Sequence, residues 1–160
     1  MKRKNILYTL LAGLMIVFLG SCQKEELVGG TATKDMSGDW FVQLDGAGDY
    51  YHFSTYNTAA NSSTEMFIDD LKSFWEMKGK VAINQSNMTF SGAAVGNTYY
   101  ESKFTLTDGV ILKNAAKAAG SKAKTDSIRF KVTFSDDKPA NGNVYTFSGY
   151  KRTGFLEDEH

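Results

Sequence analysis

Apolar and polar residues alternate along several short stretches of the chain. The clearest stretch spans residues 127–134, where every second residue is apolar: Ile128, Phe130, Val132 and Phe134. Residues 100–107 and 75–83 alternate in the same way. A period of two is typical of a β-strand with one buried face and one solvated face. The three stretches are therefore predicted to be strands.

Shorter apolar segments surround these three strands. They lie at residues 40–44, 50–56, 66–68, 88–90, 110–112 and 144–150, and turn-forming residues near positions 45, 84, 107 and 136 separate them. About eight short strands joined mostly by hairpins predict an all-β fold, an antiparallel up-and-down barrel or a sandwich. The lysine- and alanine-rich residues 113–124 predict a short exposed helix or a loop.

The alternation also predicts which large side chains share the inner face of a closed barrel. They are Trp75, Met77, Tyr100, Phe104, Phe130 and Phe134. An eight-stranded barrel is just wide enough to be filled by side chains or to hold one small ligand. Because Gly79 and Ser102 lie on the same faces and leave room, we expect an apolar ligand near Trp75. The alternative is that these side chains only pack against one another.

The N-terminus has the features of a secretory signal. Lys2, Arg3 and Lys4 precede an apolar run of about 15 residues, which is shorter than the roughly 20 residues of a transmembrane helix. The run ends in L-G-S-C, which resembles the lipobox of bacterial lipoproteins. The resemblance implies that residues 1–21 are removed and that Cys22 carries the lipid. The alternative is an ordinary signal peptide with an incidental cysteine.

The residues after Cys22 predict where the protein resides. Residues 23–26, Q-K-E-E, resemble the surface-export signal of lipoproteins in one large group of Gram-negative bacteria. The resemblance implies an outer-membrane protein that faces the medium, whereas a plain polar spacer would leave it in the periplasm. Residues 22–36 are predicted to be a lipidated flexible tether, residues 37–156 the barrel domain and residues 157–160 a solvated acidic tail.

Charge and cysteine content limit the function classes. The chain has 18 basic and 18 acidic residues, and removal of residues 1–21 takes three cations and no acid. The mature chain is therefore weakly acidic, which argues against nucleic acid as a partner. The single cysteine cannot form an internal disulfide, and acylation of Cys22 would remove the only free thiol.

The sequence contains few groups suited to catalysis. It has two histidines, His52 within a predicted strand and His160 at the end of the chain, and it has no G-x-S-x-G motif. Asp69 and Asp70 are neighbours that would point to opposite faces of a strand, so we expect them to cap a turn. The shortage of His and Cys also argues against a zinc site. No catalytic residue, metal or cofactor is predicted.

Two motifs at the ends of the predicted meander resemble those of lipocalins and other calycins. Gly38-Asp39-Trp40 opens the first strand, and Lys151-Arg152 follows the last strand. The resemblance implies that Trp40 closes one end of the barrel and that the guanidinium of Arg152 lies on its indole. The alternative is that Trp40 is an ordinary core residue.

Longer segments resemble one family of small lipoproteins, the family labelled "lipid-binding putative hydrolase". They lie at residues 55–61, 67–75, 125–130, 134–137 and 149–158. The resemblance implies a calycin-like barrel that binds a small apolar or amphipathic ligand, with a lipid anchor in the membrane. An accessory lipoprotein that docks on another envelope protein is the second hypothesis, and a hydrolase is the third. A hollow barrel would favour binding, and a filled barrel with an exposed apolar patch would favour docking.

Overall fold

The protein was analysed as a computed structural model that describes residues 30–138 and 142–160. The predicted signal peptide, Cys22 and most of the predicted tether lie outside the described residues. The described elements are η1 (Lys34–Met36), β1 (Gly38–Leu44), β2 (Ala47–Asn57), β3 (Glu65–Asp69), β4 (Lys78–Asn84), β5 (Thr89–Gly96), β6 (Lys103–Lys117), β7 (Lys124–Phe134), β8 (Tyr145–Lys151) and η2 (Leu156–Asp158).

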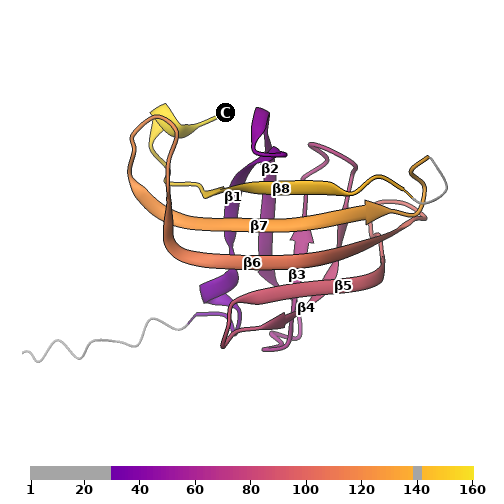
Figure 1. Cartoon of the computed structure of the whole chain (residues 1–160). Coiled ribbons are helices and arrows are strands. Elements are labelled where there is room, and N and C mark those ends of the chain that lie inside the picture. Colours follow the sequence, from indigo (N-terminus) through magenta and orange to yellow (C-terminus); the bar gives the residue numbers. More distant parts are fainter. Residues whose placement is uncertain (1–29, 139–141) are drawn as a thin grey trace, which may run out of the picture.

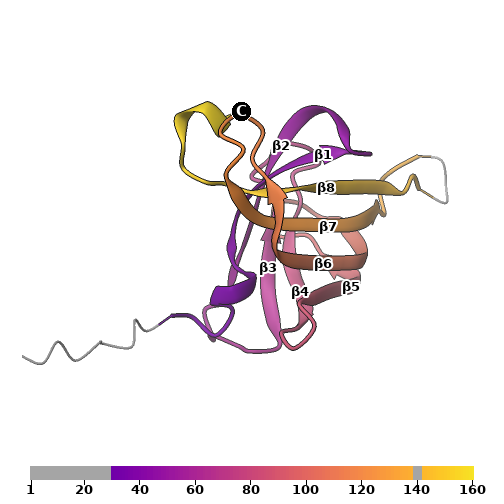
Figure 2. The same ribbon diagram turned by 60° about the vertical axis from the view of Figure 1, so that its left-hand side comes forward.

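The eight strands form a closed antiparallel barrel in which each strand pairs with the next and β8 pairs with β1. Trp40 on β1 lies opposite Phe53 on β2 and opposite Lys151 on β8, so these three residues close the seam. In Figure 1, β6, β7 and β8 pass in front of β1, β2 and β3, and Figure 2 shows the same barrel turned by 60°. The prediction of an all-β up-and-down barrel is confirmed.

The up-and-down order places alternate connections at the two ends of the barrel. We call the end with η1 and the β2–β3 and β4–β5 connections the base. We call the opposite end the mouth, which carries the β1–β2 turn, the β3–β4 loop (70–77), the β5–β6 loop (97–102) and the β7–β8 loop (135–144). The chain enters the barrel at the base, since η1 leads directly into β1 (Figure 1).

Large side chains fill the interior of the barrel. The rings of Phe53, Phe130 and Phe147 pack with centroids 5.1–5.4 Å apart, and each ring is at most 1% exposed. Gly79 leaves no space either, because an added Cβ would lie 2.6 Å from Val95 and 2.8 Å from the ring of Phe104. The expectation that Gly79 leaves room for a ligand is therefore wrong.

Two segments differ from their predicted form. Residues 107–109 form no hairpin turn, because β6 runs on through them with a shift in register between Thr107 and Val110, and Asp108 has a φ of 55°. A bulge and a turn use similar residues, so the local sequence does not separate them. Residues 113–124 form no helix: β6 extends to Lys117 and β7 begins at Lys124, so these residues are the tip of a hairpin arm.

The C-terminal residues hold this arm against the barrel. The buried carboxylate of Asp158 accepts hydrogen bonds from the N–H groups of Gly120 and Ser121 and from the hydroxyls of Ser121 and Thr153. Burial alone would raise the pKa of Asp158, but these hydrogen bonds lower it to about 2. His160 stacks on Tyr50 with centroids 3.9 Å apart. The expectation of a solvated acidic tail is therefore wrong at Asp158.

A cation closes the base, but it is not the predicted one. The Nζ of Lys151 lies 5.8 Å from the ring centroid of Trp40, whereas Arg152 forms an ion pair of 2.7 Å with Glu159. Lys151 is the register partner of Trp40 and shares its face, and the next residue on a strand points to the other face. Met36 is fully buried beside Trp40, so part of the predicted tether belongs to the packed domain.

Candidate functional site

The β3–β4 loop at the mouth is organised around one buried carboxylate. Asp70 accepts hydrogen bonds from the backbone N–H groups of Lys72 at 2.9 Å, Trp75 at 2.7 Å and Met77 at 2.8 Å. Burial raises the pKa of Asp70, and the N–H groups act against that rise. Leu71, Lys72 and Glu76 have φ angles of 49°, 62° and 49°, a conformation that costs energy for residues other than glycine.

This loop places two aromatic residues over the filled core. The ring of Phe74 lies between Tyr51, Tyr145 and Phe147, with centroids 5.0–5.2 Å apart. Trp75 stacks on Phe134, with centroids 4.7 Å apart and an interplanar angle of 11°. We call the rings that join at this end the mouth cluster: Tyr51, Phe74, Trp75, Phe134 and Tyr145.

A cleft opens beside the mouth cluster. Its volume is about 420 Å³, and Trp75, Glu76 and Tyr100 line it. Tyr100 is 37% exposed, and its hydroxyl donates a hydrogen bond of 2.7 Å to Asp136 on the β7–β8 loop. Sites for small ligands typically measure about 300–1,000 Å³ and are lined mainly by apolar and aromatic groups with a few polar ones. The cleft has a volume in this range and two aromatic rings in its lining, but it is shallow and wide open to solvent.

The six residues predicted to line the interior separate into two groups. Met77, Phe104 and Phe130 are core residues, each at most 1% exposed. Phe134 forms the floor of the mouth, whereas Trp75 and Tyr100 precede β4 and β6 and line the open cleft. The expectation that Trp75 and Tyr100 lie on strands inside the barrel is wrong. The alternation of apolar and polar residues in β4 and β6 extends into the loops that precede these strands, so it does not mark where the strands begin.

Four residues of the mouth were not predicted from the sequence. They are Tyr51, Phe74 and Tyr145 of the mouth cluster and Glu76 of the cleft. The sequence does contain a signal for Phe74. Phe74 and Trp75 follow the turn-forming Asp69-Asp70, and two adjacent aromatic residues so close to a turn indicate a loop that carries both rings. Tyr51 and Tyr145 lie near the mouth ends of predicted strands and gave no separate signal.

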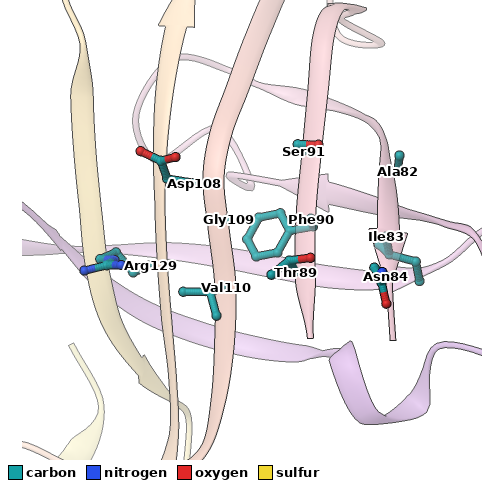
Figure 3. Close-up of a pocket in the computed structure, with 10 residues that line it drawn as sticks. All are labelled: Ala82, Ile83, Asn84, Thr89, Phe90, Ser91, Asp108, Gly109, Val110 and Arg129. Atoms are coloured by element: carbon teal, nitrogen blue, oxygen red, sulfur yellow. The ribbon is translucent and has the colours of Figure 1, made fainter. Parts of the chain in front are cut away.

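A second depression lies on the outer wall of the barrel (Figure 3). It measures about 550 Å³ and extends over β4, β5, β6 and β7. Its outward side chains are small or polar, such as Ala82, Thr89 and Ser91, and Phe90 beside Gly109 is only 3% exposed. Much of its lining is apolar, Ile83 and Val110 included, but its one aromatic ring, that of Phe90, is buried. The mouth cleft is smaller, but large rings form its walls.

The groups that could act in hydrolysis have other partners. Asp69 accepts hydrogen bonds from the hydroxyls of Tyr56 and Tyr99 and pairs with Lys78 at 3.2 Å, whereas Asp70 holds the loop. Burial would raise the pKa of Asp69, but these partners lower it. His52 packs 5.2 Å from Phe41. The expectation that the two aspartates organise a turn is confirmed by their bonds to Leu71 and Lys72.

Within residues 30–138 and 142–160, no three His, Cys, Asp or Glu side chains are grouped as metal ligands. The helices in those ranges are also too short to cross a membrane.

A closed antiparallel barrel with an aromatic cleft at one end is typical of small β-barrel proteins that bind apolar ligands. The chain belongs to the family described as "lipid-binding putative hydrolase", which residues 25–156 match. The family and the barrel fold together support a lipid-binding role. No curated protein is significantly similar to the chain.

Proposed function

We propose that this protein binds a small apolar or amphipathic ligand in the mouth cleft and is anchored to the outer membrane by lipid on Cys22. One observation carries the binding proposal. The barrel interior is filled, and the cleft of about 420 Å³ beside it has Trp75 and Tyr100 as its walls. Lipid binding at the mouth is consistent with the family of the chain.

The direction in which the chain enters the barrel supports the anchoring proposal. Residues 30–33 precede η1 at the base, and the mouth is at the opposite end (Figure 1). An anchor on Cys22 would therefore attach the domain through its base and leave the mouth at the end of the barrel away from the attachment point.

The binding proposal can be tested by the fluorescence of one residue. The chain has two tryptophans, and Trp40 is fully buried at the base and donates its indole N–H to Thr55. A Trp40→Phe variant would leave Trp75 as the only reporter. Delipidated protein titrated with a panel of fatty acids, sterols and short glycans should show a saturable change with at least one compound in this variant. The matched Trp75→Phe variant should show none, and absence of binding below millimolar concentration in both would contradict the proposal.

Two experiments in cells test the anchor. Labelled fatty acid should enter the wild-type protein and not a Cys22→Ala variant; equal labelling would contradict lipid attachment. Protease added to intact cells should remove the wild-type protein. Replacement of Lys24, Glu25 and Glu26 by alanine should protect it, and protection of the wild-type protein would place it in the periplasm.

The filled interior favours a second candidate function, docking on another envelope protein. Two apolar side chains on loops of the mouth are exposed, Leu71 at 43% and Val144 at 60%. A photocrosslinker at position 144 should then give one specific adduct on intact cells, and Leu71→Ser should abolish it. Diffuse labelling that Leu71→Ser leaves unchanged would rule out this candidate.

A further inference from the structure

The walls of the mouth cleft are held in place without a ligand. The backbone N–H of Trp75 donates a hydrogen bond to Asp70, and its ring stacks on Phe134. The hydroxyl of Tyr100 is fixed by Asp136. A ligand that enters the cleft therefore does not have to order these rings, which lowers the entropic cost of binding.

Two acidic residues lie around the cleft. Glu76 belongs to its lining, and Asp136 accepts the hydrogen bond of the Tyr100 hydroxyl at the rim. Lys72 lies 3.5 Å from Glu76, but both side chains are more than half exposed and Lys72 also lies over the ring of Tyr99. An exposed pair of this kind is weak and is screened by salt. Two carboxylates and the ammonium group of Lys72 together leave a net charge of −1 around the cleft.

We infer that the cleft selects amphiphiles whose head group donates hydrogen bonds and carries no negative charge, such as the hydroxyl groups of a sugar ring. The inference rests on the proposed function, because it assigns a head-group chemistry to the same cleft. A sugar has an apolar ring face that can lie on Trp75 or Tyr100, and its hydroxyls can donate to Glu76 and Asp136. A fatty-acid carboxylate would meet the like charge of Asp136 at the rim.

Two amphiphiles with the same chain length separate the head group from the tail. Octyl glucoside and octanoate are titrated as monomers into the Trp40→Phe variant at neutral pH, with Trp75 as reporter. Repulsion between unit charges near a protein surface predicts that octyl glucoside binds about tenfold more tightly than octanoate. Equal or tighter binding of octanoate would overturn the inference but leave the binding function intact. Binding of neither compound would count against the proposed function itself.

Free glucose distinguishes a glycolipid-like ligand from a soluble sugar. Glucose should bind more weakly than octyl glucoside, because it lacks the chain that would lie along the mouth cluster. Equal affinities would mean that the cleft recognises the sugar alone, which would overturn the assignment of an amphiphile.

Substitutions that remove one charge test which group causes the preference. Glu76→Gln keeps an acceptor of the same shape. It should therefore raise the affinity for octanoate several-fold and change the affinity for octyl glucoside little. Asp136→Asn should act in the same direction and still accept the hydrogen bond from Tyr100. Glu65→Gln, at an exposed ion pair with Lys80 on β3 and β4, is the matched control and should leave the ratio unchanged. If Glu65→Gln changes the ratio of the affinities for octyl glucoside and octanoate as much as Glu76→Gln does, the role of Glu76 is overturned.

Discussion

The carboxylate of Asp70 is predicted to hold the site together, and Asp70→Ala is its most direct perturbation. The substitution removes the acceptor of three backbone N–H groups, those of Lys72, Trp75 and Met77. Hydrogen bonds to a charged group contribute about 1.5–3 kcal/mol each, and part of the loss would be recovered because water can reach the outer part of the loop. We therefore expect Asp70→Ala to lower the free energy of unfolding by about 3–5 kcal/mol.

Urea denaturation followed by circular dichroism measures this free energy. Asp70→Asn is the matched variant, because it keeps one oxygen acceptor and places an amide N–H₂ where one backbone N–H donates. It should cost less than Asp70→Ala but still disturb the loop. Fluorescence of the Trp40→Phe variant reports whether Trp75 leaves its place on Phe134. An Asp70→Ala protein within 1 kcal/mol of the wild type, with Trp75 unchanged, would refute the role of this carboxylate.

Three further predictions concern the core, the base and the C-terminus. Gly79→Ala should lower the unfolding free energy by about 1–3 kcal/mol through overpacking against Phe104, and unchanged stability in a urea titration would indicate free interior space. Trp40→Ala should cost about 3–5 kcal/mol. Lys151→Ala should cost about 1 kcal/mol through its cation–π contact with Trp40. The absence of coupling between the two substitutions in a double-mutant cycle would contradict this contact. Because the folded pKa of Asp158 is about 2 and the unfolded value is near 4, its stabilisation is present above pH 4 and lost as pH falls toward 2. The protection factors of amides in the arm should therefore fall over this range in the wild type and be low already at neutral pH in Asp158→Asn. An identical pH dependence of protection in both proteins would contradict this role of Asp158.

The regular part of the barrel could be predicted from sequence because its two faces meet different surroundings. On β7, the inward residues Ile128, Phe130 and Val132 are buried and the outward Arg129 and Lys131 are exposed, so the burial requirement is visible as alternation. The same physics makes the closed topology a reasonable expectation, since pairing β1 with β8 removes exposed edges.

The mouth could be predicted only in part. Trp75 and Tyr100 were identified as candidate ligand-contacting residues, but their place outside the strands depends on loop conformations that the alternation does not encode. The β3–β4 loop needs positive φ angles at Leu71, Lys72 and Glu76, and contacts that the alternation does not encode, those of Asp70 among them, stabilise this conformation. The choice between Lys151 and Arg152 at the base depends on a one-residue difference in register, and the resemblance to calycins did not resolve it.

The central claim is that ligand binds at the mouth cleft and not inside the barrel or on its outer wall. Two-dimensional ¹H–¹⁵N NMR of the delipidated protein tests it most directly, because the indole N–H signals of Trp75 and Trp40 report on the mouth and the base. Titration with octyl glucoside should shift the signals of Trp75 and of residues 70–77 and 97–102, and leave that of Trp40 in place. Shifts confined to Trp40 and the core, or to residues 82–91 and 108–110 around the outer depression, would contradict the account.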